Sequence, residues 1–215
     1  MKKSAIIIGA TGLTGGILLD ILIRDDSFDK IKLFSRSSAE LNDSKVEEYI
    51  IDMFQLEKYT GQFKADVVYC CIGTTKSKTP DKDLYRKIDY GIPVAAAKLS
   101  KTNNIKTFIV ISALGADSNS KVFYNKTKGE MERDVLKQNI ENTYILHPSL
   151  IVGDRNESRL GESVAAVFMR IFNFLIPKRY KIIEAKTIAK AMRVLSDGGY
   201  SEKLIPSEKI KEIVL

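Results

Sequence analysis

The sequence predicts an α/β fold in which a doubly wound, mostly parallel sheet is covered by helices on both faces. Short β-branched runs alternate with longer stretches of helical periodicity, and several runs are apolar throughout, as buried parallel strands are. This alternation implies right-handed strand–helix–strand crossovers. No linker rich in Pro, Gly or Ser divides the 215 residues, so a single domain spanning residues 1–215 is expected.

The expected elements can be placed by residue number. Strands are predicted at residues 4–8, 30–35, 46–51, 66–71, 106–112 and 143–147, and helices at 13–24, 81–101 and 121–138. After Pro148 we expect a loop at 151–161, a helix with an apolar stripe at 164–175, a short strand near 180–183, a helix at 186–196 and a strand at 203–205. Residues from about 149 to 215 would form a small C-terminal extension on the substrate side.

The composition is that of an ordinary globular protein, with 44% hydrophobic and 28% charged residues. The two cysteines, Cys70 and Cys71, are adjacent and cannot join distant segments, which predicts a reducing, cytoplasmic environment. No stretch reaches the roughly 18–20 apolar residues of a membrane span. The lysines behind the net charge of +7 are spread along the chain, which favours a solvated basic surface over a nucleic-acid interface.

A glycine-rich turn follows the first predicted strand and opens the first predicted helix. Gly9, Gly12 and Gly15 form the pattern G-x-x-G-x-x-G, with Thr11, Leu13 and Thr14 between them. Absent side chains let the backbone approach a pyrophosphate, and the helix N-terminus offers it free N–H groups. The turn therefore predicts a dinucleotide-binding (Rossmann) fold.

Ser35 and Arg36 end the second predicted strand. An NAD-specific site usually has an acidic residue here, which accepts hydrogen bonds from the ribose 2′-hydroxyl. A guanidinium can instead bind a 2′-phosphate in a forked arrangement. Arg36 thus predicts NADP(H) in preference to NAD(H), with an ordinary surface arginine as the alternative.

Ser112, Tyr124 and Lys128 are the predicted catalytic residues. Tyr124 and Lys128 are spaced i, i+4 on the predicted helix 121–138 and share one face, and Ser112 closes the strand before it. A nearby ammonium shifts a tyrosine toward useful acid–base behaviour, and Ser112 could hold a carbonyl oxygen. Lys128 could also reach the cofactor ribose. A solvated lysine beside a partly buried tyrosine is the alternative.

With these residues placed, the chain resembles the atypical branch of the short-chain dehydrogenase/reductase superfamily. Within that branch it looks most like the oxidoreductases related to the HIV Tat-interacting protein. The resemblance covers nearly the whole chain and rests on the glycine turn, Ser35-Arg36, the residues 70–76 and 112–117, the Tyr124–Lys128 pair, and the residues 154–162.

The resemblance implies further cofactor contacts. Those on the ribose and nicotinamide side would come from Cys71, Ile72, Gly73 and Thr74. Asp52 and Met53 would flank the adenine. By the same resemblance, His147-Pro148 would lie beside the nicotinamide, where relatives usually carry Arg-Pro. A lone histidine is more often structural, so a structural role for His147 is favoured over a direct one.

Arg155 and Arg159 are the predicted substrate residues. Their i, i+4 spacing near the cleft mouth would suit an anionic substrate group. They could equally pair with Glu157 and Glu162 on the surface. No metal site is predicted.

The expected activity is hydride transfer between NADP(H) and a small carbonyl or alcohol substrate, with Tyr124 as acid/base. Two alternatives remain: a sensor that binds NADP(H) and regulates a protein partner, and a sugar-nucleotide epimerase-like enzyme. The short tail argues against a full sugar-nucleotide pocket, and the intact catalytic set argues against a sensor. The apolar stripe at 164–175 would pack on the sheet or in a homodimer, rather than against a membrane.

Overall fold

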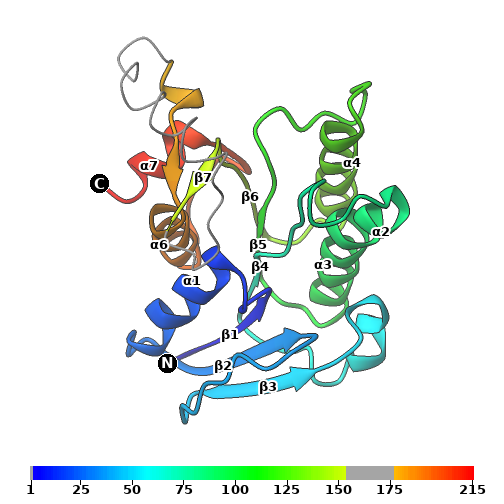
Figure 1. Cartoon of the computed structure of the whole chain (residues 1–215). Helices are drawn as coiled ribbons and strands as arrows, with labels where there is room; N and C mark the ends of the chain where they lie inside the picture. The colour runs from blue at the N-terminus through cyan, green and yellow to red at the C-terminus, as the bar shows by residue number, and fades with distance from the viewer. Residues whose placement is uncertain (1, 154–176) are drawn as a thin grey trace.

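The computed structural model describes residues 2–153 and 177–215 of the chain (Figure 1). Its main sheet consists of β1 (Lys3–Ile8), β2 (Phe28–Ser35), β3 (Val46–Ile50), β4 (Val67–Cys70), β5 (Thr107–Ile111), β6 (Asn142–His147) and β9 (Leu204–Pro206). The strand order is β3-β2-β1-β4-β5-β6-β9, and every neighbouring pair is parallel. This order is typical of dinucleotide-binding sheets. The predicted doubly wound α/β fold is confirmed.

Helices cover both faces of this sheet (Figure 1). One layer contains α1 (Leu13–Ile23) and α6 (Ala185–Leu195), with α7 (Ser207–Glu212) beside α6. The other contains α2 (Lys82–Arg86), the π-helical turn η2 (Lys87–Gly91), α3 (Ile92–Thr102) and α4 (Phe123–Leu136). The 3₁₀ turns are η1 (Met53–Tyr59) and η3 (Lys178–Tyr180), and a two-stranded sheet pairs β7 (Ile151–Val152) with β8 (Ile183–Glu184).

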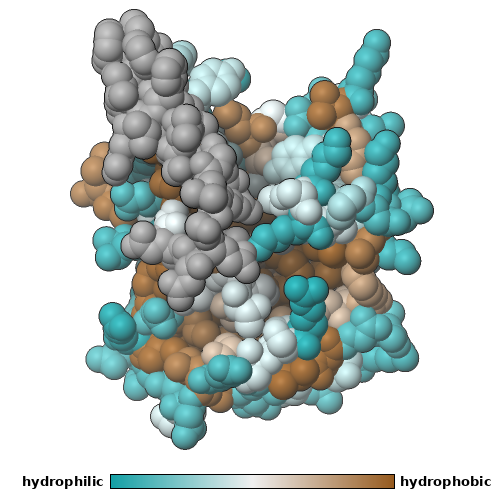
Figure 2. All heavy atoms as spheres, in the orientation of Figure 1, coloured by the Kyte–Doolittle hydropathy of each residue, from teal (hydrophilic) through white to brown (hydrophobic). Residues whose placement is uncertain are grey.

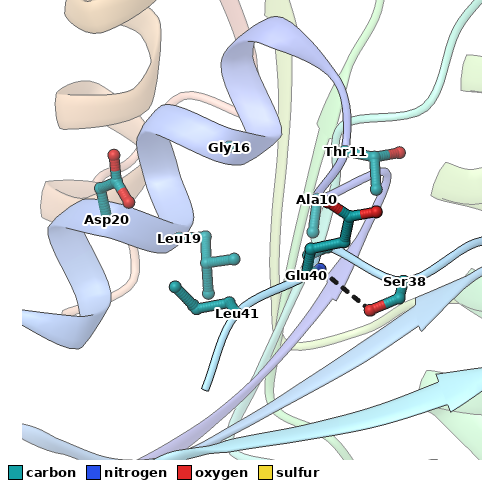
Figure 3. A pocket seen from close by; sticks show the side chains of 9 residues that line it. Ala10, Thr11, Gly16, Leu19, Asp20, Ser38, Glu40 and Leu41 are labelled. Atoms are coloured by element: carbon teal, nitrogen blue, oxygen red, sulfur yellow. Dashed lines mark hydrogen bonds between the residues drawn. The ribbon is translucent and has the colours of Figure 1, made fainter. Parts of the chain in front are cut away.

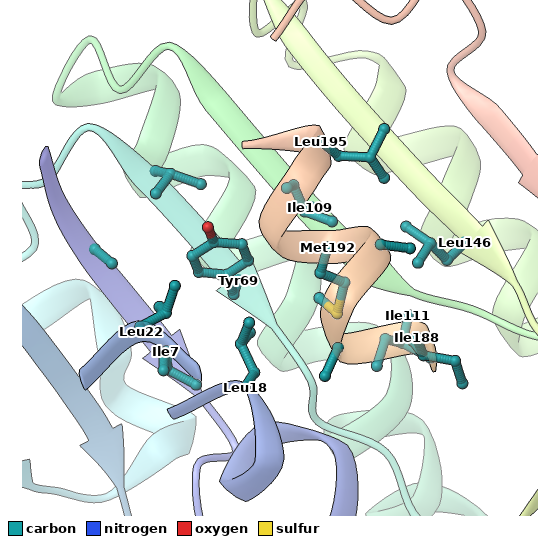
Figure 4. Close-up of a cluster of buried hydrophobic side chains, with 14 of the residues drawn as sticks. Ile7, Leu18, Leu22, Tyr69, Ile109, Ile111, Leu146, Ile188, Met192 and Leu195 are labelled. Atoms are coloured by element: carbon teal, nitrogen blue, oxygen red, sulfur yellow. The ribbon is translucent and has the colours of Figure 1, made fainter. Parts of the chain in front are cut away.

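The two helical layers explain why β1 is apolar along its whole length. Ile7 faces the hydrophobic core beneath α1 and α6, where it joins Leu18 and Met192 (Figure 4). Its neighbours Ile6 and Ile8 face a second core beneath α3 and α4. Because side chains alternate along a strand, only an apolar residue at every position can fill both cores.

The glycine turn lets α1 lie directly against the end of β1. Gly9 has a φ of +89°, a left-handed conformation that favours glycine. A Cβ added to Gly15 would lie 2.1 Å from the carbonyl oxygen of Gly9. Gly15 is therefore the residue that allows the first turn of the helix to touch the turn before it.

The helix predicted at 81–101 is interrupted. It begins one residue later, at Lys82, and contains the π-helical turn η2 before α3 continues it. Pro93 lies in the first turn of α3 and has no N–H to donate, which locally favours a wider hydrogen-bond pattern. The interruption places Asp89 in the π turn, where its side chain is buried.

The C-terminal part differs more from the prediction. The region near 180–183 contains η3 and then β8, and the loop predicted from residue 151 opens with β7. The helix α7 and the turn η1 were not predicted. The predicted helix at 164–175 lies outside the described residues, as do Arg155 and Arg159.

We predict that Gly15→Ala destabilises the fold by about 1–3 kcal/mol or more, because the new methyl group overlaps backbone atoms that cannot move independently. Gly91→Ala is the matched control: a Cβ there has open space, and alanine in a helical turn is worth roughly 0.5–1 kcal/mol over glycine. Chemical unfolding of the three proteins measures both changes. Equal stability of Gly15→Ala and wild type would contradict the packing described for this turn.

Candidate functional site

The residues predicted to bind a cofactor lie at one edge of the sheet. Because all strands of the main sheet are parallel, their carboxyl ends meet there (Figure 1). Strand order reverses between β1 and β4, which is where such sheets bind ligands. The two strand ends touch: a Cβ on Gly9 would lie 3.1 Å from the backbone nitrogen of Ile72.

The glycine turn fits a pyrophosphate group. Helix α1 starts after Gly12, and no side chain of residues 2–153 and 177–215 caps it. By contrast, the Asp81 carboxylate caps α2 by accepting a hydrogen bond from the Leu84 N–H. The first N–H groups of a helix have no partner within the helix. In α1 they are free to bind a phosphate, and the missing Cβ atoms leave the room that it needs.

A hollow of about 370 Å³ lies between the glycine turn, α1 and the loop after β2 (Figure 3). Thr11 and Leu19 line one side, and Ser38 and Glu40 line the other. The loop is held by Glu48, whose carboxylate accepts hydrogen bonds from the Ser38 hydroxyl at 2.6 Å and the Ala39 N–H at 2.7 Å. The hollow adjoins the turn where the cofactor's phosphates would lie.

Arg36 extends into solvent directly after β2. Within the described part of the chain its guanidinium forms no hydrogen bond or ion pair. Ser35 is buried and donates its hydroxyl hydrogen bond to the Ser37 carbonyl at 2.7 Å. Arg36 therefore keeps its donors available, while the Ser35 hydroxyl proton is already used.

The pair expected beside the adenine serves the fold as well. The exposed Asp52 carboxylate caps η1 by accepting from the Phe54 N–H at 3.0 Å and the Gln55 amide at 2.6 Å. These hydrogen bonds lower the pKa of Asp52. Met53 is buried in the core beneath α3.

Helix α4 places Tyr124, Lys128 and Glu132 one turn apart, at i, i+4 and i+8. Their exposure decreases along this row: Tyr124 is 38% exposed, Lys128 3% and Glu132 7%. Only Tyr124 has substantial contact with solvent. The ring of Tyr85 lies edge-on to that of Tyr124, with their centroids 6.1 Å apart.

Lys128 forms a buried ion pair with Asp89 of η2. Its Nζ lies 2.9 Å from Oδ1 of Asp89, and the two side chains are 4% and 1% exposed. Burial alone would lower the pKa of Lys128, but the Asp89 carboxylate and Tyr124 raise it above its usual value. The other oxygen of Asp89 accepts a 2.8 Å hydrogen bond from the Thr74 N–H. Asp89 thus joins the loop after β4 to α4.

The electrostatic balance at Tyr124 differs from the one expected. Burial raises the pKa of Tyr124, the Lys128 ammonium lowers it, and the Asp89 carboxylate raises it again; the net pKa lies above the ordinary value. A lysine alone would favour the tyrosinate form. Burial is the largest of these effects, and because Asp89 also offsets part of the charge of Lys128, the phenol form of Tyr124 is favoured.

Ser112 also has a partner that was not expected. Its hydroxyl donates a hydrogen bond to Oε1 of Glu132, and Nε2 of the partly buried His147 lies 2.9 Å from the same oxygen. A serine has one proton to donate. In this arrangement that proton goes to Glu132, and His147 contacts the same carboxylate, in keeping with a structural role.

Sequence analysis missed Asp89 and Glu132. Glu132 could have been found, because it continues the i, i+4 row of Tyr124 and Lys128. Asp89 carries no comparable signal, since its partners Thr74 and Lys128 are 15 and 39 residues away along the chain. Cys70 ends β4 within the core, and burial raises its thiol pKa to about 12.

The described residues contain no helix long and apolar enough to cross a membrane. The same residues contain no group of three or more His, Cys, Asp or Glu side chains placed to hold a metal ion.

We predict that Lys128→Met destabilises the protein by about 3–5 kcal/mol, because it leaves the Asp89 carboxylate buried without a partner. Lys126→Met is the matched control, since Lys126 is exposed on the same helix and should change stability by about 0.5 kcal/mol or less. Chemical unfolding measures both. A Lys128→Met protein as stable as the Lys126→Met protein would contradict the buried pair.

Known proteins share this fold and sequence. The chain is 32% identical to rat protein HTATIP2 over 97% of this chain and 88% of that protein. It is 33% identical to the mitochondrial protein FMP52 of Candida albicans over 75% of this chain and 73% of that protein. The name of the yeast relative leaves the predicted cytoplasmic location without support.

Solved structures show the same fold at low sequence identity. L-threonine 3-dehydrogenase of Trypanosoma brucei superposes with a TM-score of 0.73 at 15% identity, over 97% of this chain and 78% of that chain. UDP-glucose 4-epimerase of Thermotoga maritima gives 0.71 at 14%, over 94% and 75%. The Bordetella bronchiseptica enzyme WbmH, solved with NAD⁺, gives 0.71 at 14%, over 96% and 75%.

The family comparison covers most of the chain. The sequence model of the NAD(P)H-binding family matches residues 9–166, which include the glycine turn and the α4 residues described above. Together with the similarity to HTATIP2 and FMP52, this match shows that the chain belongs to the NAD(P)H-binding atypical short-chain dehydrogenases/reductases.

Proposed function

We propose that this chain is an NADP(H)-dependent oxidoreductase that reduces a small carbonyl compound or oxidises the corresponding alcohol. The observation that carries the proposal is the arrangement on α4. Tyr124, partly exposed, and Lys128, tied through Asp89 to the loop after β4, are held beside the switch point of the sheet. This is the edge at which doubly wound sheets bind their ligands.

The glycine turn and the N-terminus of α1 would hold the pyrophosphate of the cofactor. Arg36, with its donors available, would bind a 2′-phosphate and so favour NADP(H). The reduced cofactor, when bound, supplies the hydride. The other requirement of the reaction is proton transfer, which side chains of this protein would carry out.

Tyr124 is assigned the proton transfer. Its phenol donates a proton to the substrate oxygen as the carbonyl carbon is reduced, and solvent restores that proton through the exposed side of the ring. Lys128 keeps its charge and would bind the cofactor ribose. The Ser112 proton already goes to Glu132, so we assign proton donation to Tyr124 alone.

A sugar-nucleotide epimerase-like activity is the second candidate function, because UDP-glucose 4-epimerase of Thermotoga maritima shares this fold. The epimerase structure matched here is longer than this chain, which covers 75% of it. The described part after β6 consists of short elements and two helices.

The cofactor assignment predicts that NADPH binds more tightly than NADH. Arg36→Ala should weaken NADPH binding by roughly ten- to a hundredfold, since a charge-assisted hydrogen bond is worth about 1.5–3 kcal/mol. NADH binding should be unchanged. Arg24→Ala is the control, because Arg24 is exposed at the far end of α1. Fluorescence titration measures the affinities of the three proteins for both cofactors, and equal wild-type affinities for NADPH and NADH would refute the assignment.

The catalytic assignment predicts that Tyr124→Phe folds, still binds NADPH, and loses turnover by about 10²–10⁴-fold, the usual worth of a positioned acid. Tyr90→Phe is the control: it removes a hydroxyl that donates to Asp134 between η2 and α4. Rates of NADPH oxidation with a panel of carbonyl compounds test the pair. If Tyr124→Phe turns over as fast as wild type, Tyr124 is not the acid.

A further inference from the structure

Asp89 contacts both the loop after β4 and the lysine of α4. Its Oδ2 accepts the Thr74 N–H at 2.8 Å, and its Oδ1 lies 2.9 Å from Lys128 Nζ. The side chain is 1% exposed and projects from the π-helical turn η2. Such turns inside helices frequently occur at functional sites.

We propose that Asp89 is a positioning residue: it holds Lys128 against the loop after β4 and offsets its charge, so that Tyr124 keeps its proton to higher pH than it would beside an unpaired lysine. The inference rests on the proposed function for its chemistry. The buried Asp89–Lys128 pair itself is independent of the proposed function.

With Tyr124 in its phenol form, the hydride and the proton of the reduction each have a source. The carbonyl carbon gains the hydride supplied by NADPH, which is oxidised to NADP⁺. The carbonyl oxygen takes the Tyr124 proton, and the phenolate regains a proton from solvent. This step needs the phenol form of Tyr124, and an unpaired Lys128 ammonium would shift the equilibrium toward the phenolate.

Among the described residues, titratable groups face this pair from α2 and from β4. Tyr85 of α2 lies against the Tyr124 ring, and burial raises its pKa, so it stays neutral. Cys70 of β4 interacts with Lys128, and burial likewise keeps its thiol protonated. Of these described groups, Asp89 is the one whose charge offsets the Lys128 ammonium.

The test is a titration of Tyr124 in the protein without cofactor or substrate. The tyrosinate absorbance of each protein is recorded against pH, and the curve of its Tyr124→Phe partner is subtracted to isolate one of the nine tyrosines. In wild type, Tyr124 should ionise above about 10, the value of an unperturbed tyrosine. Ionisation at or below that value would overturn the proposal without any variant of Asp89.

Asp89→Asn should move the ionisation of Tyr124 to lower pH, since the asparagine still accepts from Thr74 but no longer offsets Lys128. The comparison is repeated in a Lys128→Arg background, where the cation cannot lose its proton. Asp83→Asn, which removes an exposed carboxylate of α2, is the control and should change nothing. An unchanged or higher ionisation pH for Asp89→Asn in the arginine background would overturn the proposal.

Once a carbonyl substrate is identified, the rate of reduction can be measured against pH. The pH above which the rate declines should be lower in Asp89→Asn than in wild type, as for the ionisation of Tyr124. A purely structural role for Asp89 would lower the amount of folded enzyme without moving that pH. If no carbonyl compound oxidises NADPH, the proposed function fails, and the titration still decides the role of Asp89.

Discussion

The buried ion pair between Asp89 and Lys128 ties together the parts of the molecule on which the site depends. Removing two charges from water is costly, and such a pair persists only where geometry and further hydrogen bonds compensate. Here the compensation comes from the Thr74 N–H at the end of β4. One carboxylate therefore fixes the distance between the sheet edge and α4, and it also sets the charge that Tyr124 experiences.

A second constraint is the shared direction of the strands. Because β1, β4, β5 and β6 are parallel neighbours or near neighbours, the turns after them collect at one edge, although they are far apart in sequence. Gly15 adds the contact that brings the start of α1 to the same place. The site is thus a consequence of sheet topology together with one close helix approach.

Hydrophobic periodicity and the glycine spacing were enough to predict most of the fold, because burial and steric fit act on residues that are close in the sequence. Both faces of β1 are buried, so its residues are apolar without alternation. The glycines of the turn are required by close backbone contacts among residues 9–15, which are neighbours in the sequence. The two-residue strands β7 and β8 are too short to show a period. The π-helical turn η2 lies just before Pro93, and the residue types of this stretch did not indicate it.

The site could be predicted only in part. Tyr124 and Lys128 are linked by helical spacing and were found together, whereas Asp89 meets them through a tertiary contact that leaves no spacing in the sequence. The missing carboxylate changed the chemistry: a tyrosine–lysine pair alone suggests an easily ionised phenol, and the trio suggests a retained proton. Likewise, Ser112 was predicted to lie at the carboxyl edge of the sheet, but the sequence did not show that its hydroxyl donates to Glu132.

The most direct test of the account is the transfer of deuterium from NADPH labelled at the reactive carbon of the nicotinamide ring. The protein would be incubated with the labelled cofactor and a panel of small carbonyl compounds, and the alcohols formed would be analysed by mass spectrometry. The account predicts an alcohol that carries the label on its carbinol carbon, formed by wild type and nearly absent with Tyr124→Phe. Tight binding of the labelled cofactor without transfer to any carbonyl compound would contradict it.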